Sequence, residues 1–581
     1  MGTTRTLREA AAATGGKAMR TAAEWTELVA SAVDNTLTFN PLLGVRRRDV
    51  AESAAALARV IAAAPRRNST HAARLLRELR EIAGGSSAIA ADPKDRRFAD
   101  PAWQGNPFHK RLLQTYLATQ GMLGRAVDES SLDERTKARA RFFTSLAWDA
   151  MAPSNWLLGN PAALRKTVES GGRNVWQGAR HMVDDLLHND GMPTQVDASP
   201  YKVGENIATT PGQVVLRHEM FELIQYAPST PKVHARPLIM SPPQVNKYYA
   251  IDLTPEKSLA KWAVDSGIQF FVISWRNPTV EHGHWGLDDY VLALDAAVEA
   301  AKAITGSADV NMWGSCSGGM TLAAYLGWLA ARGEEKVAHV TWAVCILDTH
   351  DAFGDGALGI FNTPSTLGAA KARSRRRGIV TGREMASMFA WLRSNDLVWN
   401  YWVNNYLMGN KPPAHDILAW NSDNTALPGR FHCDLLELLE HNPYRNPGKL
   451  EVAGEAIDMR RVKAGAYVIA GTNDHITPWR ACYRTARMFG PNSRFVLANA
   501  GHLQSLVNPP GQGKAFYMSG PASKADADAW LQSAKREEGS WWPDWRVWIQ
   551  RRSGPRVEAP VRLGSRRYKP LGAAPGTYVL E

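Results

Sequence analysis

A cysteine between two glycines carries the first chemical signal in the sequence. The residues Gly-Ser-Cys-Ser-Gly stand at 314–318, with the thiol at Cys316. An apolar run at 310–313 precedes them and a helical pattern at 318–331 follows, which is the strand–turn–helix context of a nucleophile elbow. Side chains in place of the flanking glycines would clash in so tight a turn. We therefore predict that Cys316 is a covalent nucleophile raised above a sheet.

Two later segments supply a base and a carboxylate. Asp474 follows the apolar run 466–470, and His502 follows the run 495–498. The chain order Cys, Asp, His is that of the α/β-hydrolase triad. In such a triad the carboxylate orients the imidazole, and the imidazole takes the proton of the nucleophile. We predict these two roles for Asp474 and His502.

Two residues are alternatives to members of this triad. His475 adjoins Asp474 and could act as the base, but neighbouring side chains on a loop usually point apart, so we expect a supporting role for it. Asp348 follows the apolar run 340–347 and could act as the acid. A polar residue at the end of a strand is more often a turn residue, which is the interpretation we favour for Asp348.

An acyl-transferring centre also needs two donors for the oxyanion of its intermediate. The main-chain N–H of Ser317, directly after the nucleophile, is expected to be one donor. The loop at 242–246 is expected to supply the other, with Val245 as the candidate. A cysteine suits thioester exchange because the thiolate is a strong nucleophile and its acyl-enzyme is itself a thioester.

The elements that must position these residues alternate along the chain. From residue 236, short apolar runs are separated by amphipathic helices such as 287–304 and 318–331. This alternation predicts an α/β fold with a mostly parallel sheet covered on both faces. With the elbow, it predicts an α/β-hydrolase core. The apolar runs are 237–241, 268–275, 310–313, 340–347, 466–470 and 495–498.

The sequence predicts three regions. Residues 1–95 are rich in Ala and Arg and are expected to form a partly disordered N-terminal extension, with a Gly-rich linker at 84–87. Residues 96–205 carry aromatic side chains at helical spacing and predict an N-terminal helical domain. Residues 206–581 would form the catalytic domain. Within it, the Trp-, Asn- and Leu-rich stretch at about 353–447 predicts an inserted cap that excludes water, with an ordinary helical subdomain as the alternative.

Composition narrows the classes of function. The 581 residues include four cysteines without C-x-x-C or metal-ligand spacing, so neither a disulfide framework nor a metal site is predicted. A reducing cytoplasm is the simplest environment for them. No apolar run of about 18 residues or more occurs, so no transmembrane span is expected. The formal net charge is +12 and is concentrated in the tail, but no nucleic-acid motif accompanies it. A solvated tail is the simplest interpretation.

Several longer motifs resemble those of the polyhydroxyalkanoate synthases. They occur from about residue 96 to the C-terminus, and the single-subunit class II type is the most similar. They are PPQVNKYY at 242–249, VISWRNP at 272–278, GSCSGG at 314–319, NYWVNNY at 400–406, GTNDHITPW at 471–479 and GHLQSLVNPPG at 501–511, with class II features at 303–307, 540–542 and 574–579.

This resemblance implies an enzyme that polymerises (R)-3-hydroxyacyl-CoA into polyhydroxyalkanoate and releases CoA. Cys316 would attack the thioester, and His502 would deprotonate a 3-hydroxyl that attacks a bound acyl group. No cofactor is implied, since the CoA thioester is the substrate. The resemblance also implies a cytoplasmic homodimer that contacts the growing polyester chain and the granule surface. The Trp-rich segment at 541–548 is a candidate for granule contact or for core packing.

Two other classes of function are alternatives to the polymerase. A thioesterase, lipase-like hydrolase or polyester depolymerase would use the triad with water as the acceptor, because a fold does not fix the acceptor. A non-catalytic granule-associated protein would need no triad. The cysteine at the elbow and the long motifs favour acyl transfer over both.

Overall fold

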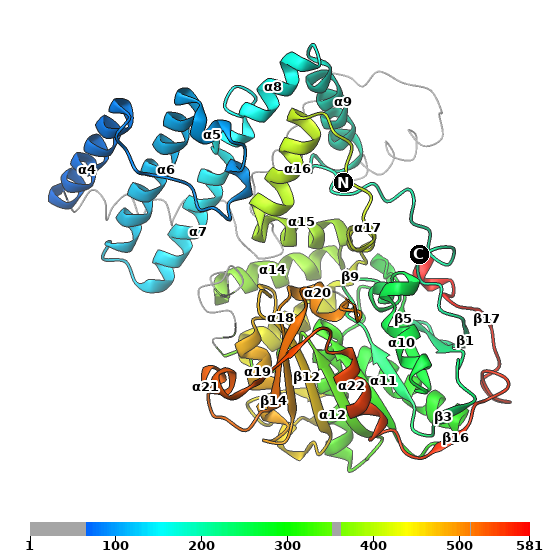
Figure 1. Ribbon diagram of the computed structural model, residues 1–581. Helices are drawn as coiled ribbons and strands as arrows, with labels where there is room; N and C mark the ends of the chain where they lie inside the picture. Colours follow the sequence, from blue (N-terminus) through cyan, green and yellow to red (C-terminus); the bar gives the residue numbers. More distant parts are fainter. Residues whose placement is uncertain (1–64, 351, 353–358, 360–361, 512) are drawn as a thin grey trace.

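An eleven-stranded sheet forms the centre of the molecule. The computed structural model describes residues 65–350, 352, 359, 362–511 and 513–581 (Figure 1). The strand order is β15-β14-β13-β12-β7-β6-β4-β5-β2-β1-β17. The central strands are parallel and are β13 (Arg494–Ala498), β12 (Gly465–Gly471), β7 (Val337–Ala343), β6 (Val310–Ser315), β4 (Leu238–Ser241) and β5 (Phe270–Trp275).

Each apolar run of the sequence becomes one of these parallel strands. The reason is that helices cover both faces of the sheet, so successive side chains are buried whichever way they point. Strands β5 and β6 are buried along their whole length, and β12 is buried from Ala466 onward. The prediction of an α/β-hydrolase core with a mostly parallel sheet is confirmed.

The two edge strands of the sheet, β15 and β17, had no such signal. Strand β15 has the sequence Lys-Arg-Glu-Glu, and β17 contains only two residues. Short, charged strands are typical of sheet edges, where one side faces solvent. The antiparallel strands on the two sides of the parallel centre are β1 (Gly212–Arg217), β2 (Phe221–Tyr226), β14 (Phe516–Pro521), β15 (Lys535–Glu538) and β17 (Gly572–Ala573).

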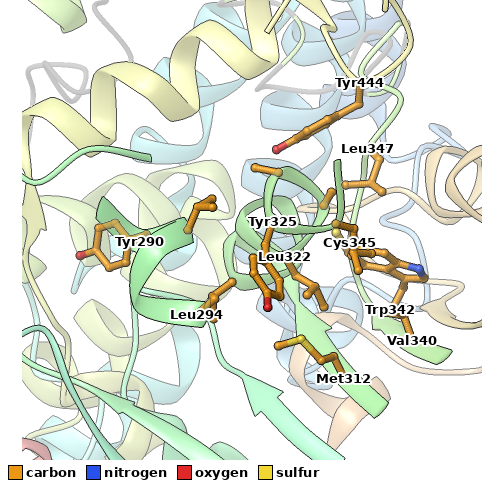
Figure 2. Close-up of a cluster of buried hydrophobic side chains, with 14 of the residues drawn as sticks. Tyr290, Leu294, Met312, Leu322, Tyr325, Val340, Trp342, Cys345, Leu347 and Tyr444 are labelled. Atoms are coloured by element: carbon orange, nitrogen blue, oxygen red, sulfur yellow. The ribbon is translucent and has the colours of Figure 1, made fainter. Parts of the chain in front are cut away.

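Two hydrophobic clusters fill the two faces of the sheet. Helices α11 (Leu287–Thr305), α12 (Cys316–Arg332) and α19 (Trp479–Met488) contribute to one cluster, part of which Figure 2 shows. Helices α10 (Leu259–Asp265) and α22 (Trp542–Gln550) contribute to the other. The tryptophans at 541, 542, 545 and 548 belong to this second cluster and are buried. Of the two interpretations of this Trp-rich segment, the structure therefore favours core packing.

A set of helices is inserted between β7 and β12, which are neighbours in the sheet. In Figure 1, α14, α15 and α16 lie between the sheet and the N-terminal helices. Helix α16 is flanked by two π-helical segments, Asn395–Trp399 and Val403–Leu407. The inserted helices are α14 (Pro364–Arg377), α15 (Gly382–Leu392), α16 (Asn400–Trp402), α17 (Asp416–Ser422) and α18 (Gly429–His441).

The chain before the first strand is helical. Helix α4 lies inside the predicted N-terminal extension and ends at the expected linker, whereas residues 1–64 of that extension lie outside the described residues. The predicted domain boundaries stay predictions. Among the described residues, no helix is both long and apolar enough to cross a membrane. The helices are α4 (Pro65–Gly84), α5 (Ala102–Gly105), α6 (Pro107–Asp128), α7 (Glu134–Ala150), α8 (Pro161–Glu169) and α9 (Arg173–His188).

Candidate active site

Cys316 stands at the turn between β6 and α12. It is the first residue of the helix, and its φ angle of 47° lies in the left-handed region, which is strained for a residue with a side chain. A Cβ on Gly314 would lie 2.7 Å from the Cα of Gly319, and a Cβ on Gly318 would lie 2.3 Å from the main-chain oxygen of Pro242. Both flanking glycines are therefore required by close backbone packing, as the elbow interpretation expects.

The structure brings Asp474 and His502 together with this thiol. The two residues lie at the ends of the neighbouring parallel strands β12 and β13. His502 Nδ1 is 2.7 Å from Asp474 Oδ2. Because an ionised carboxylate only accepts hydrogen bonds, Nδ1 carries the proton and Nε2 is left for the nucleophile. The side chain of Cys316 is within hydrogen-bonding reach of His502.

Burial and charge act in opposite directions on the imidazole. Burial by itself lowers the pKa of His502. The Asp474 carboxylate, and then the hydrogen bond and charge of Cys316, outweigh burial and raise this pKa to about 10. Burial raises the pKa of Asp474, but His502 and hydrogen bonds from Thr477 lower it below its usual range. The imidazolium is thus stabilised in the folded protein, as a proton acceptor beside a thiol requires.

Thr477 holds the carboxylate and was not predicted. Asp474 Oδ1 accepts the main-chain N–H groups of Ile476 and Thr477, both at 2.9 Å. Asp474 Oδ2 accepts the Thr477 hydroxyl at 2.6 Å. A threonine three residues after an aspartate is a local turn pattern, so the sequence did contain a weak signal for this contact.

The two alternative residues lie in different surroundings. The pKa of His475 is lowered by burial and by Arg393 of the inserted helices. Asp348 accepts hydrogen bonds from the His350 N–H and from Asn442 Nδ2, at 3.2 and 2.9 Å. Asp348 is therefore held in a turn after β7, in agreement with the interpretation that we favoured for it.

The loop at 242–247 lies against the elbow. Gln244 N–H donates to the Ser317 hydroxyl at 3.2 Å, and Gln244 Nε2 donates to Thr321 at 3.0 Å. The two prolines of this loop have no N–H to offer. Val245 is therefore the first residue of the loop whose N–H has no partner within the described chain. The N–H of Ser317, in the first turn of α12, has no helical partner either.

The other cysteines are structural. All four cysteines lie in the described part of the chain, and Cys316 is the one that is partly exposed. Burial raises the pKa of the Cys345 and Cys482 thiols well above their usual range. Figure 2 shows Cys345 among apolar side chains that include Leu322 and Leu347. These thiols are poor nucleophiles because the reactive form is the thiolate.

Comparison with known proteins places this geometry in a family. A family profile described as "Poly-beta-hydroxybutyrate polymerase (PhaC) N-terminus" matches residues 94–263, and one described as "alpha/beta hydrolase fold" matches residues 243–509. The chain is 48% identical to poly(3-hydroxyalkanoate) polymerase 1 of Ectopseudomonas oleovorans, over 96% of this chain and 99% of the relative. The chain belongs to the poly(3-hydroxyalkanoate) polymerase family.

Two further members of the polymerase family were compared. Polymerase 2 of Ectopseudomonas oleovorans is 47% identical over 93% of this chain and 96% of its own length. The polymerase subunit PhaC of Cupriavidus necator is 39% identical over 86% and 85%. The chain is thus more similar to the two Ectopseudomonas oleovorans polymerases than to the Cupriavidus necator one, in agreement with the predicted class II type. A monoacylglycerol lipase structure from Paleococcus ferrophilus is 13% identical, with a TM-score of 0.31, over 57% of this chain and 98% of the lipase.

Proposed function

We propose that this poly(3-hydroxyalkanoate) polymerase polymerises (R)-3-hydroxyacyl-CoA and releases CoA, with Cys316 as its covalent nucleophile. The observation that carries the proposal is a partly exposed thiol within reach of His502, in a chain related to such polymerases over nearly its whole length. A thiol at this position favours exchange between thioesters, since the acyl-enzyme and the substrate have similar energies.

The reaction has two acyl transfers. His502 Nε2 takes the proton of the Cys316 thiol, and the thiolate attacks the carbonyl carbon of the acyl-CoA. The C–S bond to CoA breaks, and the imidazolium returns the proton to the leaving thiolate. His502 then takes the proton of a 3-hydroxyl, whose oxygen attacks a bound acyl thioester. An ester forms as the C–S bond of that thioester breaks, and the imidazolium returns the proton to the thiolate that leaves. Asp474 stabilises the imidazolium in both steps, and the N–H groups of Ser317 and Val245 bind the oxyanion.

Water must be kept from the acyl-enzyme if the acceptor is to be a hydroxyl. The charges of Arg393 and Asp396, from the inserted helices, act on His475 directly beside Asp474. The inserted helices thus lie close enough for their charges to act beside the triad, in keeping with the proposed role as a cap that excludes water. We assign His475 a supporting role there.

The proposed surroundings follow from the same chemistry. The reaction needs no cofactor besides the CoA thioester that is its substrate. The growing chain is an insoluble polyester, so we place the enzyme in the cytoplasm, as a homodimer at the granule surface.

The test is the fate of the acyl group. The purified chain is incubated with (R)-3-hydroxybutyryl-CoA or (R)-3-hydroxyoctanoyl-CoA, and free CoA is measured with a thiol reagent. The acyl products are measured by gas chromatography after methanolysis of the insoluble fraction. We expect CoA release matched by polyester. Stoichiometric soluble hydroxy acid would instead show a hydrolase. The Cys433→Ala variant, which changes a buried thiol, is the matched control and should retain activity.

A further inference from the structure

Lys247 joins three segments that are far apart in the sequence. Its side chain is only 7% exposed, although it carries an ammonium group. The Nζ atom donates to the main-chain oxygen of Val579 at 2.6 Å and lies 2.9 Å from Asp423 Oδ1. Lys247 thus links the loop beside the elbow to the inserted helices and to the C-terminus. A buried ammonium is tolerated only with such partners, because its desolvation is costly.

The loop that carries Lys247 touches the nucleophile helix directly. Two hydrogen bonds from Gln244 reach Ser317 and Thr321, and Gly318 packs on the main-chain oxygen of Pro242. Val245, the candidate oxyanion donor, lies between Gln244 and the anchored Lys247. A displacement of a few tenths of an ångström in this loop therefore changes the distance from its N–H groups to a bound thioester oxygen.

The inserted helices hold the same loop from another side. The Thr425 hydroxyl donates to the main-chain oxygen of Gln244 at 2.7 Å. Trp420 Nε1 donates to the main-chain oxygen of Lys247 at 2.8 Å. The second oxygen of Asp423 accepts the Tyr249 hydroxyl at 2.8 Å. The carboxylate that pairs with Lys247 is therefore itself fixed.

The C-terminal partner of Lys247, Val579, is held in place through the buried carboxylate of Glu222. Glu222 accepts the main-chain N–H groups of Thr577 and Tyr578 at 2.8 and 3.1 Å. Val579 follows and is 1% exposed. Its carbonyl oxygen is thus a rigid acceptor for the ammonium, and the last residues of the chain become part of the support of the loop.

We propose that Lys247 is a positioning residue, which holds the loop at 242–247 so that its main-chain donor faces the thioester oxygen. The inference rests on the proposed acyl transfer. It predicts that Lys247 acts on the stabilisation of the oxyanion and not on the formation of the Cys316 thiolate, because the side chain contacts the loop's supports and neither His502 nor Asp474.

The test compares Lys247→Met with Lys257→Met in the full-length chain. Lys257 makes an equally direct ion pair with the inserted helices, at 2.6 Å from Asp416, but lies beyond the loop, so it controls for lost docking of those helices. Two rates are measured for each variant: CoA release from (R)-3-hydroxybutyryl-CoA, and alkylation of Cys316 by iodoacetamide. Alkylation needs the thiolate and His502 but no oxyanion donor.

We expect Lys247→Met to lower kcat by about 10- to 100-fold, less than the loss of a whole oxyanion donor. Its KM and its alkylation rate should stay within about twofold of wild type. Lys257→Met should keep kcat within about threefold. Equal kcat values for the two lysine variants would overturn the proposal. A parallel loss of alkylation would also overturn it, since the effect would then be a general disturbance of the site.

A second variant guards against simple misfolding. Lys247→Met combined with Asp423→Asn leaves no buried unpaired charge, and Asn still accepts the Tyr249 hydroxyl, so the fold should be recovered. The low kcat should persist, because the tether is still missing. Recovery of kcat in this double variant would show that Lys247 only compensates a charge. If the wild type makes soluble hydroxy acid, the proposed polymerisation fails, but the same kcat comparison still decides the role of Lys247.

Discussion

The backbone of Cys316 stores strain at the point where chemistry is proposed. Its left-handed φ angle of 47° is normally left to glycine. The strain persists because β6 on one side and α12 on the other fix the turn. Strained residues of this kind concentrate at active sites, where the strain orients a reactive group.

We expect Cys316→Ala and Cys316→Gly to fold and to lower CoA release by at least about a thousandfold, because the nucleophile is gone. The glycine variant should be the more stable of the two by up to about 1 kcal/mol, since glycine relieves the left-handed strain at some cost in entropy. Denaturant unfolding of both variants measures the difference. An alanine variant as stable as the glycine variant would mean that the turn is not strained.

The pair of His502 and Asp474 predicts a pH dependence. The folded pKa of His502, about 10, lies above its reference value of 6.5, so the pair stabilises the fold fully below about pH 6.5. This stabilisation is lost as the pH rises toward 10. Asp474→Asn removes the charge that raises the pKa. The difference in melting temperature between wild type and Asp474→Asn should therefore narrow between pH 7 and pH 10.

The same substitution should slow CoA release by about 10²- to 10⁴-fold, because the imidazolium loses its stabilising charge. The neighbouring His475→Gln is the control for a general disturbance of the loop and should lose far less activity. If the difference in melting temperature between wild type and Asp474→Asn is constant across this pH range, the Asp474 charge does not control the pKa of His502.

At the scale of elements, α9 packs closely against the inserted helices. A Cβ on Gly178 of α9 would lie 1.8 Å from the main-chain oxygen of Tyr406, in the second π-helical segment. Tyr406 also donates from its hydroxyl to Asp185 at 2.7 Å. Asn174 Nδ2 donates to the main-chain oxygen of Leu407 at 2.8 Å. The N-terminal helices thus support the irregular backbone of the inserted segment.

Gly178→Ala should destabilise the protein by about 1–3 kcal/mol, because the added methyl group must displace a main-chain oxygen. Gly124→Ala is the matched control, since Gly124 of α6 has open space around its would-be Cβ. That substitution should be neutral or stabilising by up to about 1 kcal/mol, as expected for alanine in a helix. Thermal unfolding of both variants checks the contrast, and similar melting temperatures would argue against the close contact.

At the scale of the whole molecule, the C-terminal segment adds the last strand at one edge of the sheet. Strand β17 pairs with β1 at the sheet edge, and the segment after it reaches Glu222 on β2. The side chain of Glu222 is fully buried and also pairs with Arg217 at 2.7 Å. In Figure 1 the red C-terminal segment runs beside β1. The basic tail, expected from its charge to be solvated, thus contains ordered contacts with the core.

Glu222→Gln should cost about 1–3 kcal/mol of unfolding free energy, because a neutral amide cannot accept all these hydrogen bonds. The released tail should then be trimmed faster by carboxypeptidase, which mass spectrometry measures. Glu219→Gln is the control, because Glu219 lies on the exposed turn between β1 and β2. Unchanged trimming in Glu222→Gln would show that the carboxylate does not retain the C-terminus.

The sequence by itself determined the parallel strands and the triad order. Strands buried on both faces appear in the sequence as continuous apolar runs. An elbow needs glycines at fixed positions, here two residues before and two residues after Cys316. Local patterns of this kind can be interpreted without knowing what lies opposite them in space.

Only the tertiary structure decided which distant segments meet. Strand β17 and the Glu222 contact have no pattern of their own, because a two-residue strand and a single buried carboxylate depend on their partners. Lys247 looks like any surface lysine until Asp423 and Val579 are placed around it. Burial and pairing across hundreds of residues are properties of the folded chain, and they give these ordinary residues their proposed roles.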